Sequence, residues 1–210
     1  MDHKTPNLSP GLVSSLTDQD AKIVKQEVCF KGFFQMTKLT FSHRLFEGGW
    51  SPELSRERFD RGPAVGVLLF DVNRDKIVLV EQFRVGALSE PSPWIFEVVA
   101  GMIEPGKTPE AVAIRETLEE TGAVISELTH ICDYLVSPGG TDEKMYLYMA
   151  KVDSEHINGC HGLPEEGEDI KVHTISTTDA LTAVRSGRIN NAATVIALQW
   201  LEIQRLKGIF

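Results

Sequence analysis

The pattern of apolar and polar residues divides the chain into a strand-rich beginning and a mixed remainder. From residue 23 onward, β-branched and aromatic residues alternate with polar ones, which predicts strands over Val24–Phe30 and Phe33–Phe46. Gly48-Gly49 then indicates a turn, and Arg56–Arg61 is short and heavily charged. These elements hold too little apolar surface for a good core of their own. We expect a small β-subdomain that packs on the main domain or on a second subunit.

Continuous apolar runs replace the alternation from Pro63 onward. Such runs are typical of strands that are covered on both faces. They predict strands over Ala64–Phe70, Lys76–Phe83, Trp94–Ala100, Leu128–Val136, Lys144–Val152 and Ile170–Ile175. Apolar residues at helical spacing predict helices over Thr178–Ser186 and Asn191–Leu206, and His156–Asp169 reads as an acidic loop. Mixed strands with helices on either side fit an α/β/α sandwich.

The segment Gly101–Ala123 is a glycine-rich turn that leads into a short helix. Thr108 can cap this helix, Pro109 suits its first turn, and Gly122 can end it. Helical spacing then predicts one apolar face and one acidic face. The apolar face, expected to dock on the core, contains Ala111, Ile114 and Leu118, and the roughly opposite face contains Glu116, Glu119 and Glu120.

The acidic face has two interpretations. Like charges at this spacing repel each other by roughly 0.2–0.5 kcal/mol per pair on an exposed helix, and most such faces are simply solvated. A divalent cation would remove the repulsion, and Mg²⁺ prefers carboxylate oxygen. The glycine-rich turn before the helix and Arg115 beside the acids favour the second interpretation.

Composition narrows the possible classes of protein. The chain has 210 residues, of which 42 % are hydrophobic, so a sizeable core can be buried. We expect no membrane span, since no apolar run approaches the roughly 20 residues required, and no signal peptide. The formal net charge of −9 argues against a nucleic-acid binder. Cys29, Cys132 and Cys160 show no metal or redox spacing, so free, mostly buried thiols in a cytoplasmic protein are expected.

The segment from Gly101 resembles the signature box of the Nudix hydrolases. Its glycines, the Arg115-Glu116 pair and the two following glutamates match that box in register. Lys107 departs from it, because the family has its first glutamate there, and Thr117 replaces an aliphatic residue. The resemblance extends from about residue 25 to residue 206, and it implies the Nudix α/β/α sandwich with a small N-terminal β-subdomain.

Among Nudix hydrolases the chain looks most similar to the ADP-ribose pyrophosphatases. Pro138, sixteen residues after Gly122, stands where a proline is associated with those enzymes. The resemblance implies Mg²⁺-dependent hydrolysis of ADP-ribose to AMP and ribose 5-phosphate by a homodimer. It implies two regions, residues 1–60 as an arm and a dimerising β-subdomain and residues 61–210 as the hydrolase domain. Two alternatives are a Nudix hydrolase of another nucleotide sugar, such as GDP-mannose, and a weakly active ADP-ribose sensor.

The same resemblance assigns residues to the site. The implied metal ligands are the Ala100 carbonyl and the carboxylates of Glu116, Glu120 and Glu168. Glu119 lies nearby, and Arg115 would orient the glutamates. Glu166 in the acidic loop is the expected base, with Glu168 as the runner-up. The implied substrate contacts are Phe33, Arg56, Arg84, Ser137, Pro138 and Gly140. Phe33 would stack on the adenine or, in the other interpretation, serve as a core aromatic residue.

Overall fold

The computed structural model describes residues 12–210 of the chain. Residues 1–11, most of the expected N-terminal arm, therefore lie outside the described part. The described chain divides into two compact units. The smaller unit comprises the described residues through Arg61 together with Ser137–Asp142, and the main unit comprises Gly62–Val136 and Glu143–Phe210.

The smaller unit is built on an antiparallel sheet of three strands in the order β1-β2-β3. A short 3-10 helix, η2 (Asp18–Asp20), precedes the strands β1 (Ala21–Lys31), β2 (Gln35–His43) and β3 (Leu54–Asp60). The charged segment Arg56–Arg61 thus lies largely in β3. The loop from Ser137 attaches to this sheet, since the Phe59 N–H donates to the Gly140 carbonyl at 2.8 Å and the Thr141 hydroxyl donates to the Phe59 carbonyl at 2.9 Å.

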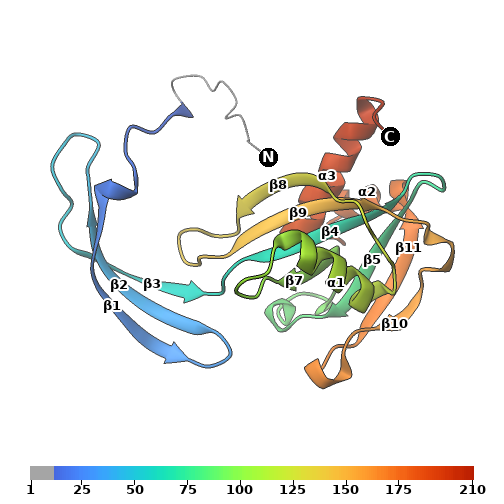
Figure 1. The fold of residues 1–210 in the computed structure, drawn as a ribbon, viewed down its shortest axis with the longest axis horizontal. Helices are drawn as coiled ribbons and strands as arrows, with labels where there is room; N and C mark the ends of the chain where they lie inside the picture. Colours follow the sequence, from blue (N-terminus) through green and yellow to red (C-terminus); the bar gives the residue numbers. More distant parts are fainter. Residues whose placement is uncertain (1–11) are drawn as a thin grey trace. The chain divides into compact units, whose positions relative to one another are not determined.

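The main unit contains an eight-stranded mixed sheet (Figure 1). Six strands follow the order β10-β11-β5-β4-β9-β8, while β6 pairs with β5 and β7 with β4. Only β4 and β9 run parallel among the pairs of described strands. The strands are β4 (Ala64–Asp71), β5 (Lys76–Phe83), β6 (Trp94–Glu97), β7 (Val99–Met102), β8 (Thr129–Leu135), β9 (Lys144–Lys151), β10 (Gly159–His161) and β11 (Ile170–Ser176).

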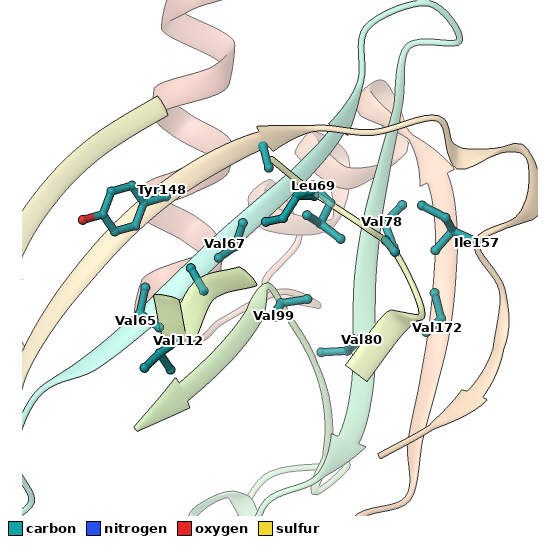
Figure 2. Close-up of a cluster of buried hydrophobic side chains, with 14 of the residues drawn as sticks. Val65, Val67, Leu69, Val78, Val80, Val99, Val112, Tyr148, Ile157 and Val172 are labelled. Carbon is teal, nitrogen blue, oxygen red and sulfur yellow. The ribbon is translucent and has the colours of Figure 1, made fainter. Parts of the chain in front are cut away.

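Helices cover both faces of this sheet. The α-helices are α1 (Pro109–Thr121), α2 (Thr177–Arg185) and α3 (Ala192–Leu206), and the 3-10 helices are η3 (Val85–Ala87), η4 (Ser154–His156) and η5 (Pro164–Glu166). Successive side chains of β4 alternate between two cores, because strand residues point to opposite faces. Val65, Val67 and Leu69 pack with α1, as Figure 2 shows in part, whereas Leu68 and Phe70 pack with α2 and α3. This arrangement confirms the predicted α/β/α sandwich.

Two segments differ from the predicted elements. The strand predicted over Trp94–Ala100 is two strands, β6 paired with β5 and β7 paired with β4, which meet at Val98. Val98 is buried, and its N–H donates to the hydroxyl of Thr194 on α3 at 2.9 Å. The segment read as an acidic loop contains η4, β10 and η5. A three-residue strand has too few positions to show a period, so β10 has no recognisable pattern in the sequence.

The face of α1 that packs on the core was predicted wrongly. Ile114 and Leu118 are exposed, Leu118 by 52 %. The buried residues of the helix are Val112, Ala113, Thr117, Glu120 and Thr121. Thr117 and Thr121 can be buried because each hydroxyl donates to the carbonyl four residues earlier, at 2.7 and 2.6 Å. The helix therefore turns a carboxylate toward the sheet.

Two further features concern the cysteines and the helix lengths. The three cysteines are free, as expected, but Cys29 and Cys160 are exposed rather than buried. Both lie in strands at a sheet edge, β1 and β10, where one side of the strand pairs with no other described strand. No helix among residues 12–210 has the length and apolar character needed to cross a membrane.

Candidate active site

The ends of α1 are fixed by local chemistry. The Thr108 hydroxyl accepts a hydrogen bond from the Ala111 N–H at 3.2 Å, and Pro109 occupies the first turn. At the other end Gly122 has a φ of 69°, which a residue without a Cβ adopts without strain. The Gly122 N–H donates to the Leu118 carbonyl at 2.9 Å. These caps agree with the prediction and hold the glutamates of the helix in fixed positions.

Arg115 is the centre of a group of carboxylates. Its Nη1 donates to Glu119 Oε2 at 3.0 Å, and its Nη2 donates to Glu104 Oε1 at 2.8 Å. Glu116 Oε1 lies 2.9 Å from the same Nη2 as an ion pair. The predicted orienting role of Arg115 is consistent with these contacts. Glu104 is a residue that the sequence reasoning missed, although it is the acidic residue of the turn that precedes the helix.

Glu116 and Glu120 are carboxyl groups in an unfavourable environment. Burial raises the pKa of Glu116 to about 7, and the charges of Glu119, Glu168 and Glu104 add to the effect, while Arg115 opposes it. Glu120 is only 2 % exposed, and burial together with the charge of Glu116 raises its pKa well above the usual range. Buried carboxyl groups with raised pKa values, which ionise readily only beside a positive charge, are typical of functional sites.

Gly101 lies directly against one of these acids. A Cβ at position 101 would lie 2.1 Å from Glu116 Oε1, which is far inside van der Waals contact. Gly101 belongs to β7, and the neighbouring Ala100 N–H donates to Glu120 Oε2 at 3.4 Å. The glycine therefore allows β7 and the acidic side of α1 to approach each other closely.

Glu168 belongs to the same electrostatic group. Its negative charge raises the pKa of both Glu116 and Glu120. Its Oε2 accepts a hydrogen bond from the Leu163 N–H at 3.0 Å, which closes the loop around η5. Glu166, the expected base, is the last residue of η5, and its side chain lies outside the described part of the structure. Its role stays a prediction.

The chemistry of these groups fits a hard divalent cation. Glu116, Glu120 and Glu168 offer carboxylate oxygens, and a cation would offset both their burial and their mutual repulsion. Within residues 12–210, no three His, Cys, Asp or Glu side chains converge at ligand spacing. Each of the three acids instead has a protein partner: Arg115 for Glu116, the Ala100 N–H for Glu120, and the Leu163 N–H for Glu168. A cation held by these three acids would compete with those partners.

Arg84 is close to the same acids. Its positive charge lowers the pKa of Glu120, against the raising effect of burial. Its Nε donates to Glu97 Oε2 at 2.7 Å, and the side chain is partly exposed. The contact with Glu97 fixes Nε of the planar guanidinium, and its other two nitrogens are the ones that could bind an anion such as a phosphate.

The other predicted substrate contacts belong to the smaller unit. Phe33 lies between β1 and β2 and is 85 % exposed, so its interpretation as a core aromatic residue is wrong. Arg56 is exposed on β3 and donates from Nη1 to the carbonyl of Ser55 at 2.8 Å. Ser137, Pro138 and Gly140 form an exposed tight turn. The Gly140 N–H donates to the Ser137 carbonyl at 3.0 Å, so this amide serves the turn itself.

Comparisons with known proteins identify the family of this chain. The sequence profile of the NUDIX domain matches residues 60–195. The ADP-ribose pyrophosphatase of Escherichia coli (strain K12) is 45 % identical over 192 residues, which cover 90 % of this chain and 92 % of that protein. The ADP-ribose pyrophosphatase of Haemophilus influenzae is 41 % identical over 195 residues, 91 % of this chain and 90 % of the relative.

More distant relatives were also found. A GDP-mannose pyrophosphatase from Enterobacter sp. (strain 638) is 30 % identical over 188 residues, 88 % of this chain and 96 % of the relative. A crystal structure of an ADP compounds hydrolase has the same fold, with a TM-score of 0.70 at 21 % identity over 93 % of this chain and 98 % of that one. The profile match and the identity to full-length relatives together show that this chain belongs to the NUDIX domain family.

Proposed function

We propose that the protein hydrolyses the pyrophosphate bond of ADP-ribose, giving AMP and ribose 5-phosphate. The observation that carries this proposal is the 45 % identity, over nine-tenths of both chains, to relatives named ADP-ribose pyrophosphatase. The relatives named GDP-mannose pyrophosphatase share 30 % or less. The presence of Glu116, Glu119 and Glu120 on the helix of Arg115, together with the acidic loop, supports a hydrolase rather than a sensor.

We further propose Mg²⁺ as the cofactor. Glu116, Glu120, Glu168 and the carbonyl of Ala100 would hold it, with Glu119 nearby. When bound, Mg²⁺ supplies charge that polarises the phosphate oxygens and lowers the pKa of a water molecule. Arg115 keeps the glutamates oriented through its ion pairs. Glu166 would accept the proton of the attacking water as the general base.

The remaining assignments concern the substrate. Arg84 would neutralise phosphate charge, because a guanidinium binds phosphate through two parallel hydrogen bonds. Phe33 would stack on the adenine, and Arg56 would bind a phosphate. The turn of Ser137, Pro138 and Gly140 would present a rigid backbone to the sugar. These roles rest on the positions of the residues in the sequence, and each exposed side chain is accessible to a ligand.

A hydrolysis panel tests the function directly. The purified protein would be incubated with ADP-ribose, GDP-mannose and other nucleotide sugars, with Mg²⁺ or with a chelator, and the products separated by chromatography. We expect ADP-ribose to be consumed fastest, with AMP and ribose 5-phosphate as products, and only in the presence of Mg²⁺. Preference for GDP-mannose would contradict the substrate assignment. Tight binding of ADP-ribose without turnover would contradict the enzyme assignment and favour the sensor.

We also propose a cytoplasmic homodimer. All eleven residues of β1 are exposed, and they include Ile23, Val28 and Phe30. An apolar strand at the edge of a sheet is a surface that proteins usually cover. A second copy of the chain is the partner we assign to it. The three free cysteines fit a reducing compartment, and the net charge of −9 argues against nucleic acid as a partner.

A further inference from the structure

The turn before α1 contains a carboxylate that the box pattern does not require. Position 107, where the Nudix box has a glutamate, is an exposed lysine in this chain. The Lys107 N–H donates to the Glu104 carbonyl at 3.1 Å, so the two residues are the ends of one tight turn. The turn thus has a lysine at position 107, where the Nudix box has a glutamate, and a glutamate at its other end, position 104.

Glu104 and Glu116 compete for the same nitrogen of Arg115. Nη2 lies 2.8 Å from Glu104 Oε1 and 2.9 Å from Glu116 Oε1. The hydrogen bond of Nη2 is directed at Glu104, and that of Nη1 is directed at Glu119. A planar guanidinium that is held at both nitrogens has a fixed orientation. Glu116 therefore shares Nη2 with Glu104 and is not the only carboxylate partner of that nitrogen.

We propose that Glu104 is a positioning residue that holds Arg115 when Glu116 binds a metal ion. Because Nη2 already has a hydrogen-bond partner in Glu104, Glu116 can turn to the cation without leaving the guanidinium unpaired. When residue 104 is neutral, Nη2 turns its hydrogen bond to Glu116 and competes with the cation. This inference rests on the proposed metal-dependent function, and it explains how the site accommodates Lys107.

The affinity for Mg²⁺ tests this role of Glu104. It would be measured by isothermal titration calorimetry on the protein without substrate. Glu104→Gln removes the charge and keeps the shape of the side chain. We expect the Kd for Mg²⁺ to rise about tenfold, as is common for residues that orient metal ligands. Glu127→Gln, which alters an exposed acid beyond the end of α1, is the matched control and should leave the Kd unchanged. An unchanged Kd in Glu104→Gln would overturn the proposal.

A double-mutant cycle shows whether Glu104 acts through Arg115. In the background of Arg115→Lys, which cannot bind three carboxylates in one plane, Glu104→Gln should add less than about twofold to the Kd. If Glu104→Gln raises the Kd for Mg²⁺ by the full factor of about ten in the Arg115→Lys background as well, Glu104 acts on the metal by its charge alone. That result would overturn the positioning role. The midpoint of thermal unfolding should stay at the wild-type value, since exposed ion pairs contribute little stability.

Turnover separates this inference from the proposed function. With ADP-ribose as substrate, saturating Mg²⁺ should restore the kcat of Glu104→Gln to the wild-type value. A kcat that stays low at saturating Mg²⁺ would overturn the positioning role. Wild-type protein that binds Mg²⁺ but does not hydrolyse ADP-ribose would contradict the proposed substrate. Even then, a lower Mg²⁺ affinity of Glu104→Gln than of the wild type would support the role of Glu104.

Discussion

Gly101 and Glu116 lie so close together that any side chain at residue 101 would collide with Glu116 in its present position. A Cβ there would lie 2.1 Å from Oε1 and 2.4 Å from Cγ of Glu116. Gly101→Ala should therefore force Glu116 into another rotamer and separate it from Arg115. We expect the protein to fold and to lose about a hundredfold in kcat, a loss typical of a displaced electrostatic group.

The control for this substitution is Gly86→Ala. Gly86 lies in η3 and has no atoms within 4 Å of a built Cβ, so the same added methyl group meets open space. Its steady-state rate with ADP-ribose and Mg²⁺ should equal that of the wild type. A Gly101→Ala variant with normal turnover would contradict the assignment of Glu116 as a metal ligand.

Glu120→Gln separates activity from stability. The amide can still accept the hydrogen bond of the Ala100 N–H, so the local structure should persist. Because burial and Glu116 raise the pKa of Glu120, removing its charge should leave the free energy of unfolding unchanged or higher. Mg²⁺-dependent turnover should fall roughly a hundredfold. Glu127→Gln, which alters an exposed acid beyond the end of the same helix, should change neither quantity, and wild-type turnover in Glu120→Gln would contradict the metal site.

The sequence predicted the strands and the helix ends around the site better than the side-chain contacts within it. Apolar runs and cap residues located the strands and both ends of α1, because each depends on a few neighbouring residues. The orientation of α1 was wrong because the prediction placed all carboxylates outside. Glu120 is buried while Leu118 is exposed, and helical spacing alone does not show which of two faces meets the sheet.

Contacts between residues far apart in the sequence could not be predicted from the sequence either. Glu104 reaches Arg115 across eleven positions, and Arg84 is fixed by Glu97 across thirteen. Neither spacing belongs to a helix or strand period, so only the folded chain reveals the pairs. The glycine at position 101 was found through the box pattern, yet its physical reason, the approach of Glu116, is visible only in the structure.

Arg84→Lys should weaken substrate binding more than metal binding. Lysine keeps the positive charge but loses the planar fork, which removes one hydrogen bond to a charged partner worth about 1.5 kcal/mol. We expect KM for ADP-ribose to rise about tenfold, with the Mg²⁺ dependence unchanged. Arg185→Lys, which alters an exposed ion pair with Glu202, should leave KM unchanged. An unchanged KM in Arg84→Lys would remove Arg84 from the substrate site.

Asp71 gives the protein an acid-dependent stability. It is fully buried and accepts hydrogen bonds from the N–H groups of Asn73 and Arg74 at 3.0 Å and from the Ser154 N–H at 2.9 Å. Against the raising effect of burial, these bonds hold the pKa of Asp71 far below its usual 3.8. The unfolded chain therefore binds the proton first, so this stability is complete above about pH 4 and is lost as the pH falls.

Asp71→Asn tests that contribution. The amide presents N–H groups to donors, so we expect a loss of about 3 kcal/mol in the free energy of unfolding at pH 7. The loss should shrink as the pH drops below the carboxyl range, which denaturant titrations at several pH values would measure. Asp153→Asn, at the exposed side of Arg74, is the control and should cost less than about 1 kcal/mol. A variant as stable as the wild type would contradict the role of Asp71.

The exposed strand β1 leads to a prediction about assembly. Phe30 is 65 % exposed on β1, and we assign this strand to a contact with a second copy of the chain. Phe30→Glu places a charge in that contact and should raise the dimer Kd by about thirtyfold or more, as expected for a central aromatic residue worth about 2 kcal/mol. Sedimentation velocity over a concentration series would measure the shift. Phe46→Glu makes the same change at an exposed phenylalanine between β2 and β3, and it should leave the dimer intact. A wild-type protein that sediments as a monomer, or a Phe30→Glu variant that dimerises as tightly as the wild type, would mean that β1 has another partner.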